Sequence, residues 1–239
     1  MGTPLVPPTA SNARVPGARG GTSNLRILIA DDHDLMRRGL KSLLESHPGW
    51  TICAEANTGR EAVEKAEELK PDIVILDITM PELNGVEAAR RILKASPSAE
   101  ILVLSVHYSD QLAREVLDAG VRGYILKSDS DRDLVIAVEA LANHKPFFTP
   151  RARELILSFF DRKDGSPGLP EVIRERLTSR EREIVQLLSE GRSSKEVASV
   201  LSISVKTAET HRSNIMRKLG IHPLSELVRY AVRNQIIEA

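Results

Sequence analysis

The chain has 239 residues, a hydrophobic fraction of 41% and a charged fraction of 28%, which is typical of a soluble protein with room for two compact domains. Its single cysteine, Cys53, excludes an internal disulfide and favours a cytoplasmic location. No stretch reaches the roughly 18 apolar residues of a membrane span, and residues 1–24 lack the apolar core of a secretion signal, so we expect no membrane association.

The net charge of zero conceals a difference between two parts of the chain. Residues 25–143 carry 14 Lys and Arg against 21 Asp and Glu, a net charge of −7. Residues 177–239 carry 10 against 7, a net charge of +3. This asymmetry suggests a cation-dependent site in the first part and an anionic partner for the second, although ordinary scatter of surface charge would give the same totals.

The chain opens with a Pro-, Gly-, Ala- and Ser-rich segment, residues 1–24, which we expect to be a disordered tail. Five short apolar runs follow, each succeeded by a polar segment with apolar residues three and four apart. These runs are 25–31, 51–56, 72–77, 100–105 and 123–127. Strands alternating with helices predict an α/β domain over 25–143, with a flavodoxin-like, doubly wound, five-stranded parallel sheet covered on both faces.

Residues 144–176 are expected to be a linker that contains one amphipathic helix, which begins near Pro150. From Leu177 to residue 239 the apolar period is helical throughout. Four features predict helix ends here: capping boxes at Thr178–Glu181 and Ser193–Glu196, and stops at Gly191 and Gly220. They predict an all-α, four-helix domain in which a short helix (193–201), a turn and a longer helix (205–219) form a helix-turn-helix, before a last helix from Pro223.

Four of the predicted strands end in polar residues: Asp31 and Asp32, Asp77, Ser105 and Lys127. The carboxyl ends of parallel strands meet at one edge of the sheet, so these side chains should converge. Three carboxylates repel one another unless a divalent cation and an ammonium offset their charge, and oxygen ligands suit Mg²⁺. Such an aspartate can attack phosphorus, with Mg²⁺, Lys127 and Ser105 around the phosphoryl oxygens. Each residue alone could be a helix cap or surface group; the complete set favours phosphoryl transfer.

The helix 205–219 has one apolar and one polar face. The inward face is expected to comprise Val205, Ala208, Ile215, Met216 and Leu219. The outward stripe comprises Lys206, Glu209, Thr210, Ser213 and Arg217. This mixture of donors and acceptors suits a helix in the major groove of DNA, with Lys195, Arg212 and Lys218 reaching phosphates; a merely solvated face is the alternative.

Residues 25–143 resemble the receiver domain of two-component systems. The motifs that carry this resemblance are Asp31-Asp32-His33, Asp77-Ile-Thr-Met-Pro81 with Gly85, Leu104-Ser105 and Gly123-Tyr124-Ile-Leu-Lys127. The resemblance implies that Asp77 accepts a phosphoryl group from a sensor histidine kinase. It implies that Asp31, Asp32, Asp77 and the backbone carbonyl of Thr79 hold Mg²⁺. It also implies that Lys127 and Ser105 bind the phosphoryl oxygens, with Ser105 and Tyr124 as the switch pair.

Residues 177–236 resemble the LuxR-type DNA-binding domain of NarL/FixJ-class response regulators. The matching motifs are Leu177-Thr-Ser-Arg-Glu181, Lys195-Glu-Val-Ala198, Val205-Lys-Thr-Ala-Glu-Thr-His211-Arg212 and Ile215-Met-Arg-Lys-Leu219-Gly220. The resemblance implies base contacts from Glu209, Thr210 and Ser213, and backbone contacts from Lys206 and Arg212. It also implies that the last helix pairs in an active homodimer on double-stranded DNA.

We therefore expect a phosphorylation-controlled transcriptional regulator whose only catalysis is its own phosphorylation and dephosphorylation. The unphosphorylated receiver would shield the recognition helix or the dimer surface, and phosphorylation would release or pair the DNA-binding domains. One rival is a DNA-binding regulator whose receiver is a phosphate-independent dimerisation module. Another is an aspartyl-phosphate phosphohydrolase, but such enzymes carry a second aspartate where this chain has Thr79.

Overall fold

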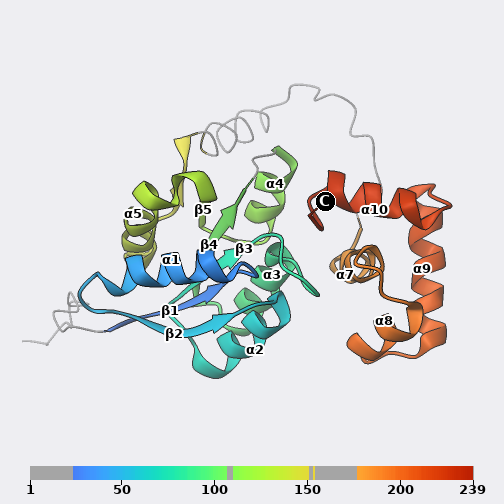
Figure 1. The fold of residues 1–239 in the computed structure, drawn as a ribbon, viewed down its shortest axis with the longest axis horizontal. Coiled ribbons are helices and arrows are strands. Elements are labelled where there is room, and N and C mark those ends of the chain that lie inside the picture. The colour runs from blue at the N-terminus through green and yellow to red at the C-terminus, as the bar shows by residue number, and fades with distance from the viewer. Residues whose placement is uncertain (1–23, 107–109, 151–152, 154–176, 239) are drawn as a thin grey trace, which may run out of the picture.

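The structure is a computed structural model that describes residues 24–106, 110–150, 153 and 177–238. An α/β domain and a smaller helical domain lie side by side (Figure 1). The expected tail up to residue 23 and nearly all of the expected linker helix lie outside the described residues. Among the helices that the structure describes, none combines the length and apolar character needed to cross a bilayer.

The first domain contains a parallel sheet in the order β2-β1-β3-β4-β5-β6. Its strands are β1 (Leu25–Ala30), β2 (Trp50–Ala56), β3 (Ile73–Asp77), β4 (Glu100–Ser105), β5 (Gly123–Leu126) and β6 (Phe147–Phe148). The predicted flavodoxin-like sheet is confirmed. The two-residue β6 was not predicted, because so short a run shows no period; its phenylalanines are held by packing against the apolar cores on the two faces of the sheet.

Helices cover both faces of the sheet, as the continuous apolar strands predict. The helices are α1 (Asp34–Glu45), α2 (Gly59–Leu69), α3 (Gly85–Ala95), α4 (Asp110–Asp118) and α5 (Ser130–Ala142), with a 3-10 turn, η1 (Lys127–Asp129), after β5. One core contains side chains of α1 and α5, and the other contains side chains of α2, α3 and α4. Neighbouring residues of β1 alternate between them: Ile27 belongs to the first core and Leu28 to the second.

The second domain has the predicted four helices: α7 (Ser179–Ser189), α8 (Ser194–Val200), α9 (Val205–Leu219) and α10 (Leu224–Arg233). Both predicted capping boxes form, at Thr178 and Ser193. Gly191 and Gly220 take the left-handed backbone conformation that ends α7 and α9, with φ of +87° and +64°. The predicted inward face of α9 needs one correction: Val205 is 42% exposed, because this first residue precedes the part of the helix that enters the core at Ala208.

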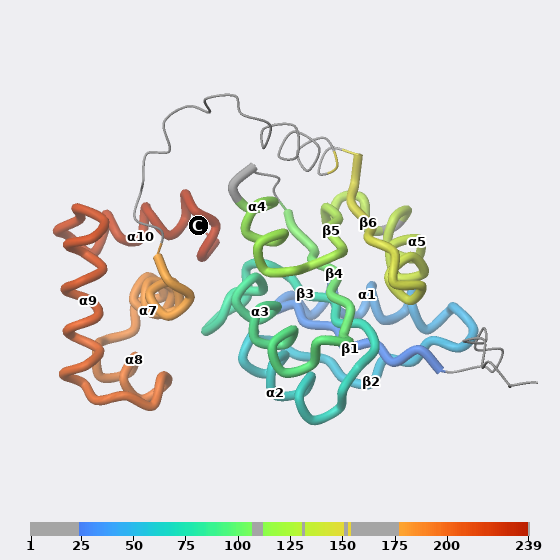
Figure 2. Tube along the Cα trace, turned by 180° about the vertical axis from the view of Figure 1, so that it is seen from behind, coloured from blue at the N-terminus to red at the C-terminus, as the bar shows by residue number. Residues whose placement is uncertain are grey.

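The two domains meet mainly through α7, which contacts α2, α3, α4 and the β3–α3 loop of the α/β domain, and Glu238 near the C-terminus adds a contact with Thr79 of that loop. In both views α9 lies on the opposite side of the helical domain (Figures 1 and 2). The side of the helical domain that touches its neighbour is therefore not the side that carries the predicted recognition helix.

Candidate metal centre and nucleic-acid interface

Strand register gathers the predicted polar residues at one edge of the sheet. Ala30 of β1 pairs with Leu76 of β3, so Asp31 and Asp77 follow at the same level. Asp77 pairs with Leu104, the residue before Ser105 on β4. Ser105 in turn pairs with the last residue of β5, after which Lys127 follows. At this edge β1 has β2 on one side and β3 on the other, so the strand order reverses here. Such a reversal is the usual ligand site of parallel α/β sheets.

Three of these side chains are in direct contact. The Lys127 Nζ atom lies 2.8 Å from Asp31 Oδ2 and 3.0 Å from Asp77 Oδ2. Both aspartates are fully buried, and the lysine side chain is only 9% exposed. One ammonium therefore bridges two carboxylates in a region of low dielectric, where charges interact strongly.

The contacts set the protonation of the cluster. Burial, together with the negative charge of Asp31, raises the pKa of Asp77 to about 6 against the opposing effect of the Lys127 ammonium. Burial lowers the pKa of Lys127, but the two carboxylates outweigh that effect and raise it above its ordinary value. The lysine is therefore charged, and the Asp77 carboxylate is a poorly solvated anion whose free energy a further cation would lower.

The donor atoms fit a hard divalent cation. One potential ligand atom each from Asp31, Asp32, His33 and Asp77 lies within 4.8 Å of the others. Asp77 Oδ1 is buried, and among the described residues it has no hydrogen-bond partner. Carboxylate oxygens are the ligands that Mg²⁺ prefers, so the site can accept the ion. The contact of His33 Nδ1 with Asp32, at 2.9 Å, was not predicted, although the residue directly follows the aspartate pair.

Arg37 is a further residue that the sequence reasoning missed. Its guanidinium is buried behind the cluster, where Nη1 donates to the backbone oxygen of Asp31 at 2.7 Å and Nη2 donates to Asp34 at 2.8 Å. It thereby ties the first turn of α1 to the end of β1. An arginine on the otherwise apolar face of a helix was the available signal.

The loop after Asp77 folds back on its strand. The Gly85 N–H donates to the Ile78 carbonyl at 2.8 Å, and a Cβ at Gly85 would lie 2.0 Å from the Asp77 carbonyl oxygen. Only glycine fits there. Thr79, the predicted backbone ligand, lies within this loop, and its hydroxyl donates to Glu238 Oε1 at 2.9 Å.

The predicted switch pair is also in contact. Ser105 and Tyr124 are 4% and 1% exposed, and their hydroxyl groups share a hydrogen bond. Burial raises the pKa of Tyr124, and the bond to Ser105 acts in the opposite direction. A movement of Ser105 toward Asp77 would therefore have to break or redirect this bond.

An open apolar groove borders the cluster. Leu35 at the start of α1 is 85% exposed and Val106 after β4 is 49% exposed, although both are large apolar residues. The groove has a volume of about 620 Å³. It is lined by His33, Leu35, Met36, Gly39, Leu40, Leu43, Val106, Lys127 and Ser130.

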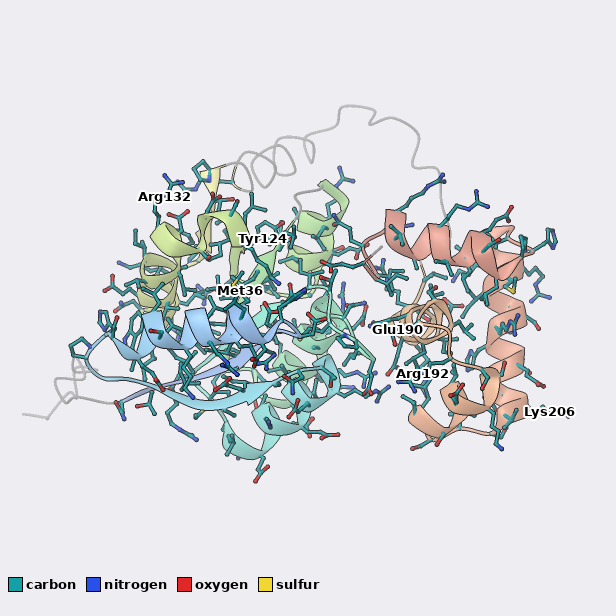
Figure 3. All side chains as sticks on the ribbon, viewed as in Figure 1. Met36, Tyr124, Arg132, Glu190, Arg192 and Lys206 are labelled. Atoms are coloured by element: carbon teal, nitrogen blue, oxygen red, sulfur yellow. The ribbon has the colours of Figure 1, made fainter. Side chains whose placement is uncertain are left out.

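The predicted recognition stripe of α9 is open to solvent. Lys206, Glu209, Thr210 and Ser213 are all exposed, as is Lys195 on α8. Figure 3 shows Lys206 at the edge of the molecule that is farthest from the α/β domain. The remaining predicted phosphate contacts are Arg212, which is half-buried, and Lys218.

The structure bears on two expectations about this surface. Lys218 Nζ lies 2.9 Å from Glu181 Oε2 and is 22% exposed, so its charge is already paired within the domain. Of the two surfaces that the receiver was expected to shield, the recognition helix is open to solvent, because the described contacts between the domains come from α7 and Glu238; shielding of the dimer surface stays a prediction.

Comparison with known proteins assigns both domains. Residues 27–139 match the model of the response regulator receiver domain, and residues 175–231 match that of the bacterial regulatory proteins of the luxR family. The response regulator protein VraR of Staphylococcus aureus is 36% identical over 214 residues, which cover 90% of this chain and 99% of that protein.

Solved structures agree with this assignment. A LuxR-family two-component response regulator from Aurantimonas is 34% identical, with a TM-score of 0.54, over 57% of this chain and 97% of its own. RcsB from Salmonella enterica, bound to a promoter in the presence of the phosphomimetic BeF3−, is 26% identical with a TM-score of 0.58. That match covers 87% of this chain and 98% of RcsB.

Proposed function

This chain belongs to the response regulators that join a receiver domain to a LuxR-type DNA-binding domain, and we propose that phosphorylation of Asp77 controls its binding to DNA. The observation that carries this proposal is the Lys127 ammonium held between the buried carboxylates of Asp31 and Asp77. Such an arrangement is costly for folding, and its use is to receive a small, highly charged group.

Asp77 is the nucleophile in this proposal. A carboxylate oxygen of Asp77 attacks the phosphorus of a phosphohistidine on a sensor histidine kinase, the P–N bond breaks, and the imidazole, already protonated on its other ring nitrogen, leaves as the neutral base. Lys127 and Ser105 then bind the phosphoryl oxygens. The groove around Leu35 and Val106 offers an apolar surface beside the site, which suits approach by a protein phosphodonor.

Mg²⁺ would be held by Asp31, Asp32, Asp77 and the backbone carbonyl of Thr79. When bound, it neutralises negative charge on the phosphoryl group and on the carboxylates. Arg37 keeps Asp31 in place by holding its backbone oxygen. The chain's own catalysis is limited to its phosphorylation and dephosphorylation.

The phosphorylated protein binds double-stranded DNA as a homodimer in the cytoplasm, with α9 in the major groove. Glu209, Thr210 and Ser213 contact bases, and Lys206, Arg212 and Lys195 contact phosphates. The exposure of the α9 stripe supports this assignment, and so does the RcsB relative that is bound to a promoter. Because α9 is exposed while the domains are docked, phosphorylation regulates the placement and pairing of the domains rather than access to this helix.

The test is incubation of the full chain with acetyl phosphate and Mg²⁺, followed by mass measurement of the intact protein. We expect one phosphoryl group on the wild type, none after addition of EDTA, and none on Asp77→Asn. The exposed Glu64→Gln on α2 is the control and should be labelled like the wild type. Equal labelling of Asp77→Asn would contradict the proposal, whereas absence of labelling in every sample would favour a phosphate-independent dimerisation module.

A further inference from the structure

The contact between the domains includes a polar side chain that is almost completely buried. Gln186 of α7 is 1% exposed, although glutamine is normally a surface residue. Its Nε2 donates to the Met80 carbonyl oxygen at 2.8 Å, and its Oε1 accepts from the Asn84 N–H at 2.7 Å. Both partners are backbone groups of the β3–α3 loop, residues 79–84, in the other domain.

This loop is directly connected to the phosphorylation site. It begins two residues after Asp77 and contains Thr79, the proposed backbone ligand of Mg²⁺. Its far end is tied back to the residue that follows the strand, because the Gly85 N–H donates to the Ile78 carbonyl. Glu82 in its middle has a φ of +67°, a left-handed conformation that is unfavourable for a residue with a Cβ and that needs surrounding contacts to persist.

Two carboxylates of the DNA-binding domain hold the same loop. Glu190 Oε1 accepts from the Glu82 N–H at 3.0 Å and from Gln186 Nε2 at 2.8 Å. Glu238 accepts from the Thr79 hydroxyl at 2.9 Å. Figure 3 shows Glu190 on the side of its domain that faces the receiver. The docked domain therefore fixes the loop by hydrogen bonds and adds negative charge to it.

The rest of the interface is held by ion pairs away from this loop. Glu183, which is fully buried, lies 2.8 Å from Arg91 Nη2 of α3 and also pairs with Arg60 of α2. Arg182 forms a two-pronged pair with Glu115 of α4, at 2.6 and 2.9 Å. These ion pairs strengthen the docking of the two domains. Only the hydrogen bonds of Gln186, Glu190 and Glu238 reach the 79–84 loop.

We propose that Gln186, a residue of the DNA-binding domain, is a positioning residue for the phosphorylation site of the receiver, because it holds the 79–84 loop in the arrangement that opposes phosphorylation. The inference rests on the proposed function of Asp77. A phosphoryl group adds about two negative charges next to a loop that already carries the contacts of Glu190 and Glu238. Docking of the DNA-binding domain and phosphorylation thus compete for the 79–84 loop. Each lowers the equilibrium constant of the other by the same factor.

This route differs from the one through Ser105 and Tyr124. The switch pair lies on β4 and β5, whereas Gln186 contacts the loop that follows β3. The docked domain therefore responds to the phosphorylation site through the proposed metal-binding loop itself.

The test compares two full-length variants that each remove one interdomain contact. Gln186→Leu keeps the side-chain bulk but removes both bonds to the loop. Arg182→Gln removes the pair with Glu115 and leaves the loop contacts intact. The measured quantities are the rate of Asp77 phosphorylation by acetyl phosphate with Mg²⁺, and the BeF3− concentration at half-saturation, followed by fluorine NMR.

We expect Gln186→Leu to need about fivefold less BeF3−, the lower end of usual coupling between sites, and to be phosphorylated faster than the wild type. Arg182→Gln weakens docking without touching the loop, so it should change both by a clearly smaller factor than Gln186→Leu, with circular dichroism confirming that both variants are folded. Equal rates in Gln186→Leu and wild type, or equal effects in the two variants, would overturn the inference and leave the function of Asp77 intact. A wild type that takes no phosphoryl group on Asp77 would overturn both.

Discussion

The receiver site and the α9 surface use polar side chains in opposite ways. At the receiver site, Asp31, Asp77 and Lys127 are buried and touch one another. On α9, Glu209 and Ser213 are exposed. In the proposed function the first arrangement receives one small, charged group, whereas the second becomes an interaction surface only when a large polyanion covers it.

This difference predicts how each site responds to substitution. Removing one member of a buried charge cluster leaves the others without compensation, so the effect should be large and close to all-or-none. Removing one contact from an extended, solvated surface should reduce affinity in steps, because each contact contributes independently.

The largest effect is expected for Lys127→Met. Loss of the ammonium removes the charge that stabilises the transferring phosphoryl group, which should slow phosphorylation of Asp77 by acetyl phosphate at least about a hundredfold. The control is Lys145→Met, at an exposed position, which should retain the wild-type rate. A Lys127→Met protein that is folded and labelled normally would contradict the assigned role of this lysine.

The next effect concerns stability and its pH dependence. Because burial raises the pKa of Asp77 from 3.8 to about 6, Asp77→Asn should raise the free energy of unfolding by roughly 2 to 3 kcal/mol at pH 7.5 without Mg²⁺. Between these two pH values Asp77 binds a proton in the folded wild type but not in the unfolded chain. Its stability relative to Asp77→Asn should therefore rise as the pH falls from about 7 to 4, and be lowest above pH 7.

Urea denaturation of both proteins at several pH values measures this difference. Addition of Mg²⁺ at pH 7.5 should stabilise the wild type more than Asp77→Asn, because the cation binds the ionised carboxylate. A variant that is less stable than the wild type at pH 7.5, with no dependence of the difference on pH, would show that Asp77 is not a destabilising buried anion.

On the recognition helix the expected effects are smaller. Glu209→Ala and Thr210→Ala should each change the preference at individual base pairs by roughly tenfold, within the usual range for a direct base contact. Selection from a library of random-sequence duplexes, followed by sequencing, would measure this. Identical preferences in wild type and both variants would place base recognition elsewhere.

The smallest effect is expected for Lys206→Ala, which should weaken binding to all sequences about threefold. Loss of one phosphate contact should also reduce the dependence of log affinity on log salt concentration by about 0.9. Titrations of one duplex at several salt concentrations would measure both. A change in sequence preference without a change in salt dependence would make Lys206 a base-contacting residue instead.

The sequence predicted the receiver site and the helix-turn-helix because both obey local rules. Continuous apolar strands with polar residues at their carboxyl ends identify the edge at which Asp31, Asp77 and Lys127 meet. The boundaries of α9 followed from its period and from Gly220.

The contact between the domains could not be predicted in the same way. Periodicity separates the face of a helix that its own domain buries from the face that it leaves open. It does not show whether a second domain covers the open face, so nothing in the sequence marks Gln186 and Glu183 of α7 as residues of a domain interface. The same limit explains why shielding of α9 was one of the two alternatives expected, although the domains meet elsewhere.

The most direct test of phosphorylation control is the affinity of the full chain for a selected duplex, before and after treatment with acetyl phosphate and Mg²⁺. The wild type should bind at least about tenfold more tightly after treatment, a gain of about 1.4 kcal/mol, and Asp77→Asn should not change. An equal gain in Asp77→Asn, or no gain in fully phosphorylated wild type, would contradict control of DNA binding by Asp77.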